Sequence, residues 1–176
     1  MSDTMVQGPM PPWKRALRGQ FGAAVETLQR AIEACPETLW GQRDAKPEYW
    51  RVAYHTLFFL DLYMRDSPEG FAPPPPFTLD EGDPDAPDPP QPYSKRDLQQ
   101  YLRRLRVQAR ESIDSLSDDR AAERCGFHWV EGSVLELYLY NLRHVQHHAA
   151  QLNLLLRQNV GSAPKWVRRA DDSDAT

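Results

Sequence analysis

Four segments of this sequence carry apolar residues at steps of three and four, and that spacing constrains the fold more than any other feature. It is the period that lines one face of an amphipathic helix. Nothing alternates with period two for long enough to make a strand, so we predict an all-α fold, a four-helix bundle. The helices are predicted over residues 12–34, 47–66, 94–116 and 133–158. The second is apolar around most of its circumference and should be largely buried.

The connection between the second and third predicted helices is unusual in length and composition. Residues 67–93 hold ten of the 16 prolines, together with an acidic cluster of Asp80, Glu81, Asp83, Asp85 and Asp88. We predict a stiff segment without regular structure. Since twenty helical residues span ~30 Å, only a long connection can return the chain from one end of a bundle to the other. The second and third helices can then run parallel.

Length and charge fit one ordinary domain, which we place at residues 1–166, followed by a flexible acidic tail at 167–176. The net charge of −4 gives no general attraction to nucleic acid or anionic lipid. The N-terminal residues lack the pattern of a secretory signal, and no apolar run reaches the ~20 residues of a membrane span. We therefore expect a cytoplasmic protein with no membrane partner. Cys35 and Cys125 are too scattered for a disulfide framework and are expected to be ordinary thiols.

The histidines are the main candidates for chemistry. His144 and His148 lie one helical turn apart, where two imidazoles can converge on one metal ion. His55 lies at a similar middle depth in the second predicted helix, so we predict a metal site formed by His55, His144 and His148. The alternative is that each is a core histidine satisfied by a hydrogen bond. Three imidazoles gathered without acidic partners would then cost ~1–3 kcal/mol for each unpaired polar atom.

His147 points about 60° away from His144 on the same predicted helix, as follows from a step of 100° per residue. It is either a solvated surface residue or a proton shuttle beside the metal, which makes it the candidate catalytic residue. His128 is expected to be a loop residue outside the site. The sequence contains no Glu-x-x-His pair of the di-iron type and no HExxH motif.

The segments YHTLFFLDLYM (residues 54–64) and NLRHVQHHAAQL (residues 141–152) resemble the DinB-like, damage-inducible family of metal-binding four-helix bundles. The resemblance implies an up-down-down-up bundle, a three-histidine site completed by water, and a homodimer. It also implies an activity of the thiol-dependent transferase or isomerase type. Ala149 and Ala150 stand where members of the family often have Arg-Gly, which puts a substrate contact of that arginine in doubt. The proline-rich loop is longer than the family suggests and would cover the mouth of the site.

Our leading hypothesis is a metal-dependent enzyme that joins a low-molecular-weight thiol to a small electrophilic substrate, with zinc or nickel preferred and iron or copper as alternatives. The same site could serve a metal-dependent hydrolase or a non-enzymatic metal-binding stress-response protein. A third alternative is nucleic-acid binding through the third predicted helix. We favour a solvated face for the arginines of that helix, and thus no nucleic-acid partner. They are Arg96, Arg103, Arg104, Arg106 and Arg110.

Overall fold

Every regular element in the described part of the chain is helical, which confirms the all-α class predicted for it. The computed structural model describes residues 9–44, 46–82 and 89–170. Its elements are α1 (Pro12–Ala34), α2 (Glu37–Trp40), α3 (Tyr49–Leu62), the 3₁₀ helix η1 (Leu79–Gly82), α4 (Lys95–Ser115), α5 (Asp118–Ala122) and α6 (Val134–Val160). Over these same residues, no helix combines the length and the apolar character needed to cross a membrane.

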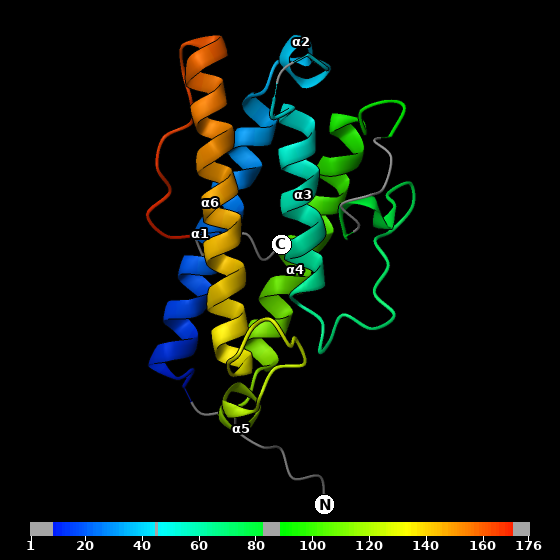
Figure 1. Ribbon diagram of the computed structural model, residues 1–176. Coiled ribbons are helices and arrows are strands. Elements are labelled where there is room, and N and C mark those ends of the chain that lie inside the picture. Colours follow the sequence, from blue (N-terminus) through cyan, green and yellow to red (C-terminus); the bar gives the residue numbers. More distant parts are fainter. Residues whose placement is uncertain (1–8, 45, 83–88, 171–176) are drawn as a thin grey trace, which may run out of the picture.

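Four long helices, α1, α3, α4 and α6, pack side by side (Figure 1). In this view α1 and α6 run from bottom to top, whereas α3 and α4 run from top to bottom. Each of α1 and α3 contacts both α4 and α6. Asn141 on α6 donates from Nδ2 to the carbonyl of Leu60 on α3 at 3.1 Å, so these antiparallel helices are held in register. Because α3 and α4 run the same way, the proline-rich connection has to bring the chain back to the top.

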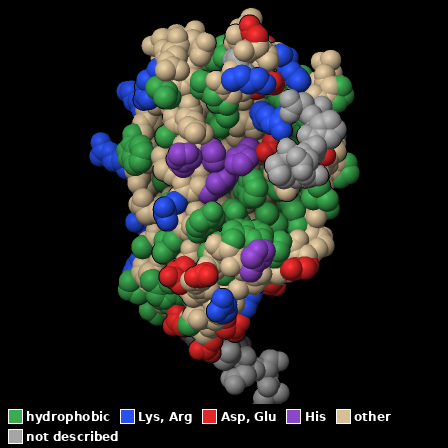
Figure 2. All heavy atoms as spheres, in the orientation of Figure 1, with side chains coloured by type: hydrophobic (Ala, Val, Ile, Leu, Met, Phe, Trp, Pro, Cys, Tyr) green, Lys and Arg blue, Asp and Glu red, His purple; other side chains and the backbone are tan. Residues whose placement is uncertain are grey.

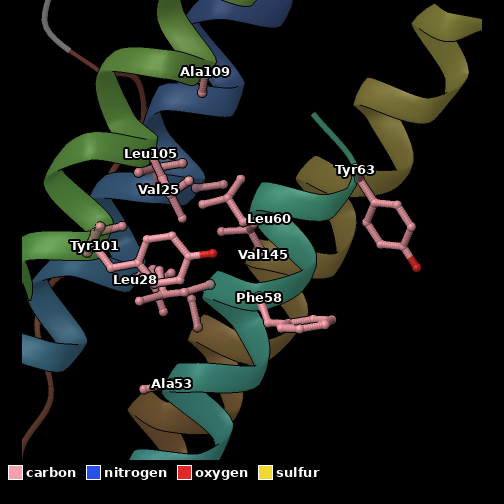
Figure 3. Packing of buried hydrophobic residues seen from close by; sticks show 14 of the residues in the cluster. Val25, Leu28, Ala53, Phe58, Leu60, Tyr63, Tyr101, Leu105, Ala109 and Val145 are labelled. Atoms are coloured by element: carbon pink, nitrogen blue, oxygen red, sulfur yellow. The ribbon is translucent and has the colours of Figure 1, made fainter. Parts of the chain in front are cut away.

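The core lies where the four long helices face one another (Figure 3). Leu28 of α1, Leu60 of α3, Leu105 of α4 and Val145 of α6 meet there, and each has no exposed surface. Burying an aliphatic side chain of this size contributes about 1.5–3 kcal/mol. Most of α3 is buried, as its apolar circumference predicted.

One carboxylate lies inside this core. Asp61 on α3 has no exposed surface and accepts hydrogen bonds from Arg104 and from the Tyr101 hydroxyl, both on α4, each at 2.8 Å. Arg65 donates to its other oxygen at 2.6 Å. A buried charge is tolerated only when it is paired and hydrogen-bonded, and this one links α3 to α4.

The helix ends follow the capping signals in the sequence. Ser133 and Glu136 form a complete capping box at the start of α6, and Gly161 ends that helix in the left-handed conformation, with φ of 79°. At the start of α4 the Ser94 hydroxyl accepts from the backbone N–H of Asp97. The Asp97 carboxylate accepts from that hydroxyl instead of from the backbone, so this capping box is incomplete.

Several predicted boundaries were wrong. The helix expected over 47–66 is shorter, because Glu48 is extended and caps α3, and because the chain leaves the helix after Leu62 through bonds between residues three apart. The short helices α2, α5 and η1 were not predicted, since four or five residues are too few to show an apolar period. The 3₁₀ turn η1 also corrects the expectation that the proline-rich connection has no regular structure.

This connection is packed against the bundle by aromatic side chains. The Phe77 ring stacks on Tyr54 of α3 and on Tyr101 of α4, with centroids 5.2 and 5.0 Å apart. Tyr93, on the other side of the undescribed stretch, contacts Tyr54 at 4.8 Å. The residues on either side of η1 are therefore tied to α3.

The chain after α6 returns toward α1. Val167 is buried, and the N–H of Ala170 donates to the carbonyl of Gly19 on α1 at 3.2 Å. Of the tail predicted to be flexible, residues 167–170 thus lie against α1. Residues 171–176, which carry its acidic part, lie outside the described residues.

Candidate metal centre

Two antiparallel helices bring the predicted metal ligands together. His55 lies in the middle of α3, while His144 and His148 lie one turn apart on α6. The bond from Asn141 to the backbone of α3 fixes the register of the two helices one turn away from His144. Three separate positions in the sequence thereby face one point.

The spacing of the ring nitrogens suits a single metal ion. Nε2 of His55 lies 3.3 Å from Nε2 of His144, and one nitrogen from each of His55, His144 and His148 falls within 4.8 Å of the others. Two ligands on a tetrahedral ion with bonds of ~2.0–2.1 Å lie about 3.3 Å apart. The pair of His55 and His144 already has that separation.

Two of the rings are oriented by oxygen acceptors behind them. Nδ1 of His55 lies 3.0 Å from a carboxylate oxygen of Glu81, and Nδ1 of His148 lies 2.7 Å from the side-chain oxygen of Gln151. Carboxylate and amide oxygens can only accept, so each Nδ1 carries the proton and each Nε2 keeps its lone pair. Outer hydrogen bonds of this kind are typical of histidines that bind metals.

Glu81 corrects the expectation that the histidines lack an acidic partner. It comes from η1, in the proline-rich connection. In the sequence it is one of several acidic residues there, and no pattern distinguishes it from the others. Its side chain is 9% exposed, so the loop holds it close against α3. Gln151 lies in the segment NLRHVQHHAAQL, but its contact with His148 is shown only by the structure.

The environment favours the neutral form of His144 and of His148. Burial, aided by the neighbouring histidines, lowers the pKa of His144 to about 3 from 6.5. Burial also lowers the pKa of His148, against the opposing effect of its bond to Gln151. A neutral imidazole offers a lone pair to a cation, whereas a protonated one does not.

Aromatic packing orients His144, because its buried Nδ1 has no hydrogen-bond partner among the described residues. The ring lies edge to face with Phe59 at 5.5 Å and with Tyr63 at 6.2 Å between centroids. As a ligand through Nε2, neutral His144 would carry its proton on Nδ1, and packing instead of a hydrogen bond would fix the direction of the ring.

The remaining histidines lie near the site or apart from it. His147 is exposed and its ring lies 4.9 Å from that of His148, so the two form part of the purple cluster at the centre of Figure 2. His128 packs against Trp129 in the loop before α6, apart from the three converging residues.

A wide, shallow hollow opens beside the cluster. His144 and His147 line it together with Tyr140, Ala150 and Trp166, and it encloses about 1130 Å³ of space that continues into solvent. The Trp166 side chain is 69% exposed. An apolar molecule could therefore lie against aromatic rings next to the imidazoles.

The thiols and the basic helix take no part in this site. Cys35 and Cys125 are both buried and unpaired, and burial raises the pKa of Cys35 to about 12. On α4, Arg104 bonds to Asp61 and Arg106 donates to Gln29 on α1 at 3.0 Å. These arginines link helices within the molecule.

The fold and the converging imidazoles define an all-helical protein with a candidate three-histidine metal site. The sequence profile of the DinB superfamily matches residues 20–152, and the chain belongs to this superfamily, which confirms the resemblance. A crystal structure of a candidate DinB family member from Exiguobacterium sibiricum 255-15 has a similar fold. It superposes with a TM-score of 0.61 at 22% identity, over 89% of this chain and 97% of that one. No functionally curated protein matches the sequence.

Proposed function

We propose that the protein is a divalent-metal-dependent enzyme that transfers a low-molecular-weight thiol to a small electrophile in the cytoplasm. One observation carries the proposal: the nitrogens of three imidazoles converge, and one of these residues, His144, also lines an open hollow. Structural metal sites are closed by four protein ligands, whereas catalytic sites keep a position free. Within the described residues, the converging set has three members.

His55, His144 and His148 would hold the ion, and imidazole ligands suit zinc or nickel best, with iron and copper as alternatives. When bound, a divalent ion in a neutral ligand set supplies Lewis acidity that lowers the pKa of a thiol or water beside it. Glu81 and Gln151 present the Nε2 lone pairs of two of the rings to it.

The other residues would place the electrophile and handle the proton. Tyr140 and Trp166 give the hollow aromatic walls for an apolar substrate. In the transfer, the thiol loses its proton, a sulfur–carbon bond forms and the leaving group departs, so the proton must reach the leaving group. His147 is exposed beside His148 and is our candidate to carry that proton.

Two other functions would use the same residues. A hydrolase would activate water in place of the thiol, and its turnover would be independent of added thiol. A non-enzymatic metal-binding protein of the stress response would use the ion to fasten α3 to α6. The hollow beside His144 favours an enzyme, because a purely structural site needs no open space.

Turnover tests the proposal. Untagged protein is loaded with zinc or nickel and incubated with cellular thiols and a panel of electrophiles, and product is measured by mass spectrometry. We expect a product whose mass is the sum of both reactants less the protonated leaving group, and no product with His144→Ala. Absence of turnover across a broad panel, with metal bound, would leave the non-enzymatic function.

We also propose that the protein forms a homodimer, as the family resemblance implies. Leu139 and Leu154 on α6 are 45% and 52% exposed and give this helix apolar surface for a partner. Sedimentation should give twice the chain mass of 20.3 kDa. A mass near that of one chain would contradict the dimer.

A further inference from the structure

We propose that Glu81 is a positioning residue of the metal centre, through which the proline-rich connection controls the affinity of His55 for metal. This inference rests on the proposed metal site but not on the reaction done there. It assigns a role to a segment that the family resemblance leaves without one.

The Glu81 carboxylate joins two residues of α3. One oxygen lies 3.0 Å from Nδ1 of His55, and the other lies 3.4 Å from Nε of Arg51, one helical turn earlier. The His55 ring has its Nε2 on the opposite side, facing His144. Glu81 thus acts through the ring and lies behind it, where it is no metal ligand.

The position of Glu81 is set by how the connection packs. Phe77 is held between Tyr54 and Tyr101, and the Tyr54 hydroxyl donates to the carbonyl of Thr78. On the far side of the turn, a Cβ built on Gly82 would lie 3.5 Å from the Phe58 ring. The turn η1 therefore packs directly against α3, and the Glu81 side chain is directed at His55.

The contact with Glu81 should make His55 a stronger and better-oriented metal ligand. A carboxylate that accepts from Nδ1 fixes the tautomer and raises the basicity of Nε2, and losing such a partner typically costs 10- to 100-fold in metal affinity. Because the turn supplies that carboxylate, a metal ion on Nε2 should in return hold the turn more firmly in place. His148 has only the neutral oxygen of Gln151 for the same purpose, so the charged partner distinguishes His55.

Metal affinity tests the inference directly. Zn²⁺ affinity is measured by competition with a chromogenic chelator on the untagged full chain, for wild type, Glu81→Ala and Glu81→Gln. We expect a 10- to 100-fold loss for the alanine variant and a smaller loss for glutamine, which keeps an acceptor oxygen without the charge. Asp80→Asn is the matched control, since it removes one charge from the same turn at a residue bonded to Thr78. It should leave affinity within twofold.

The tautomer of His55 can be measured without metal, and the order of the turn can be compared with and without it. Long-range ¹⁵N–¹H spectra of the histidine rings should show Nδ1 of His55 protonated in the wild type and a mixture of tautomers in Glu81→Ala. Hydrogen exchange at residues 77–82 should slow when Zn²⁺ binds the wild type, and stay unchanged in the alanine variant. If that variant fails to fold by circular dichroism, the glutamine variant carries the same comparison.

The outcomes separate this inference from the proposed site. A wild type without Zn²⁺ affinity would overturn the metal centre and the inference together. A wild type that binds Zn²⁺, with Glu81→Ala binding equally well, would overturn the role of Glu81 alone. Equal losses of Zn²⁺ affinity for Glu81→Gln and Asp80→Asn would show that the negative charge of the turn matters in general, and not the contact between Glu81 and His55.

Discussion

The metal-free protein should lose stability in mild acid because of His144. The pKa of this residue is lowered to about 3 in the folded state, against 6.5 in an unfolded chain. Between these values the unfolded chain binds a proton that the folded protein does not. The free energy of unfolding therefore falls as pH falls from about 6.5 toward 3, and the loss between pH 7 and pH 5 is about 2 kcal/mol. His148 shifts in the same direction and adds to this loss.

Urea unfolding in the presence of a chelator, at pH 7 and at pH 5, measures the effect. Other groups also titrate over this range, so the informative quantity is the difference between wild type and His144→Leu. The leucine variant has no proton to bind and should lose about 2 kcal/mol less than the wild type. His144→Gln serves as a polar control for the change in packing. Parallel losses in all three proteins would refute the reasoning, since His144 would then titrate normally in the folded state.

Three further predictions concern metal binding and the stability of the helical fold. Adding zinc at a hundredfold excess over its dissociation constant should stabilise the protein by about 2.7 kcal/mol and raise Tm by roughly 5–10 °C, and chelation should reverse this. An unchanged melting curve would speak against a site in the folded protein. Asp61→Ala should lower the free energy of unfolding, measured with urea, by about 3 kcal/mol. This is at the low end for a broken buried ion pair, because Arg104 is 48% exposed and regains contact with water. A loss under ~1 kcal/mol would mean that the hydrogen bonds of Asp61 add little to stability. Gly126→Ala puts a Cβ 2.2 Å from the carbonyl oxygen of Asp66, so Tm should fall by several degrees, corresponding to 1–3 kcal/mol of overpacking. An unaltered Tm would show that the loop shifts without cost.

The sequence by itself determined the helices and the three converging histidines. Helical period and capping are local properties, so the limits of α1 were predicted to the residue and those of α4 to within one. The pair on α6 could be found for the same reason, because residues four apart share a helix face. His55 was recognised by its depth in a helix of otherwise large apolar residues.

Only the tertiary structure decided what surrounds those imidazoles. Glu81 reaches His55 because aromatic side chains pack the proline-rich connection against α3. The residues that make this packing follow no periodic pattern in the sequence. In the sequence Asp61 is likewise just a polar residue in an apolar helix, and only the structure shows that Tyr101 and Arg104 of α4 are its partners. Contacts between distant segments are fixed by the shape and charge of both surfaces at once, whereas a sequence pattern describes one surface at a time.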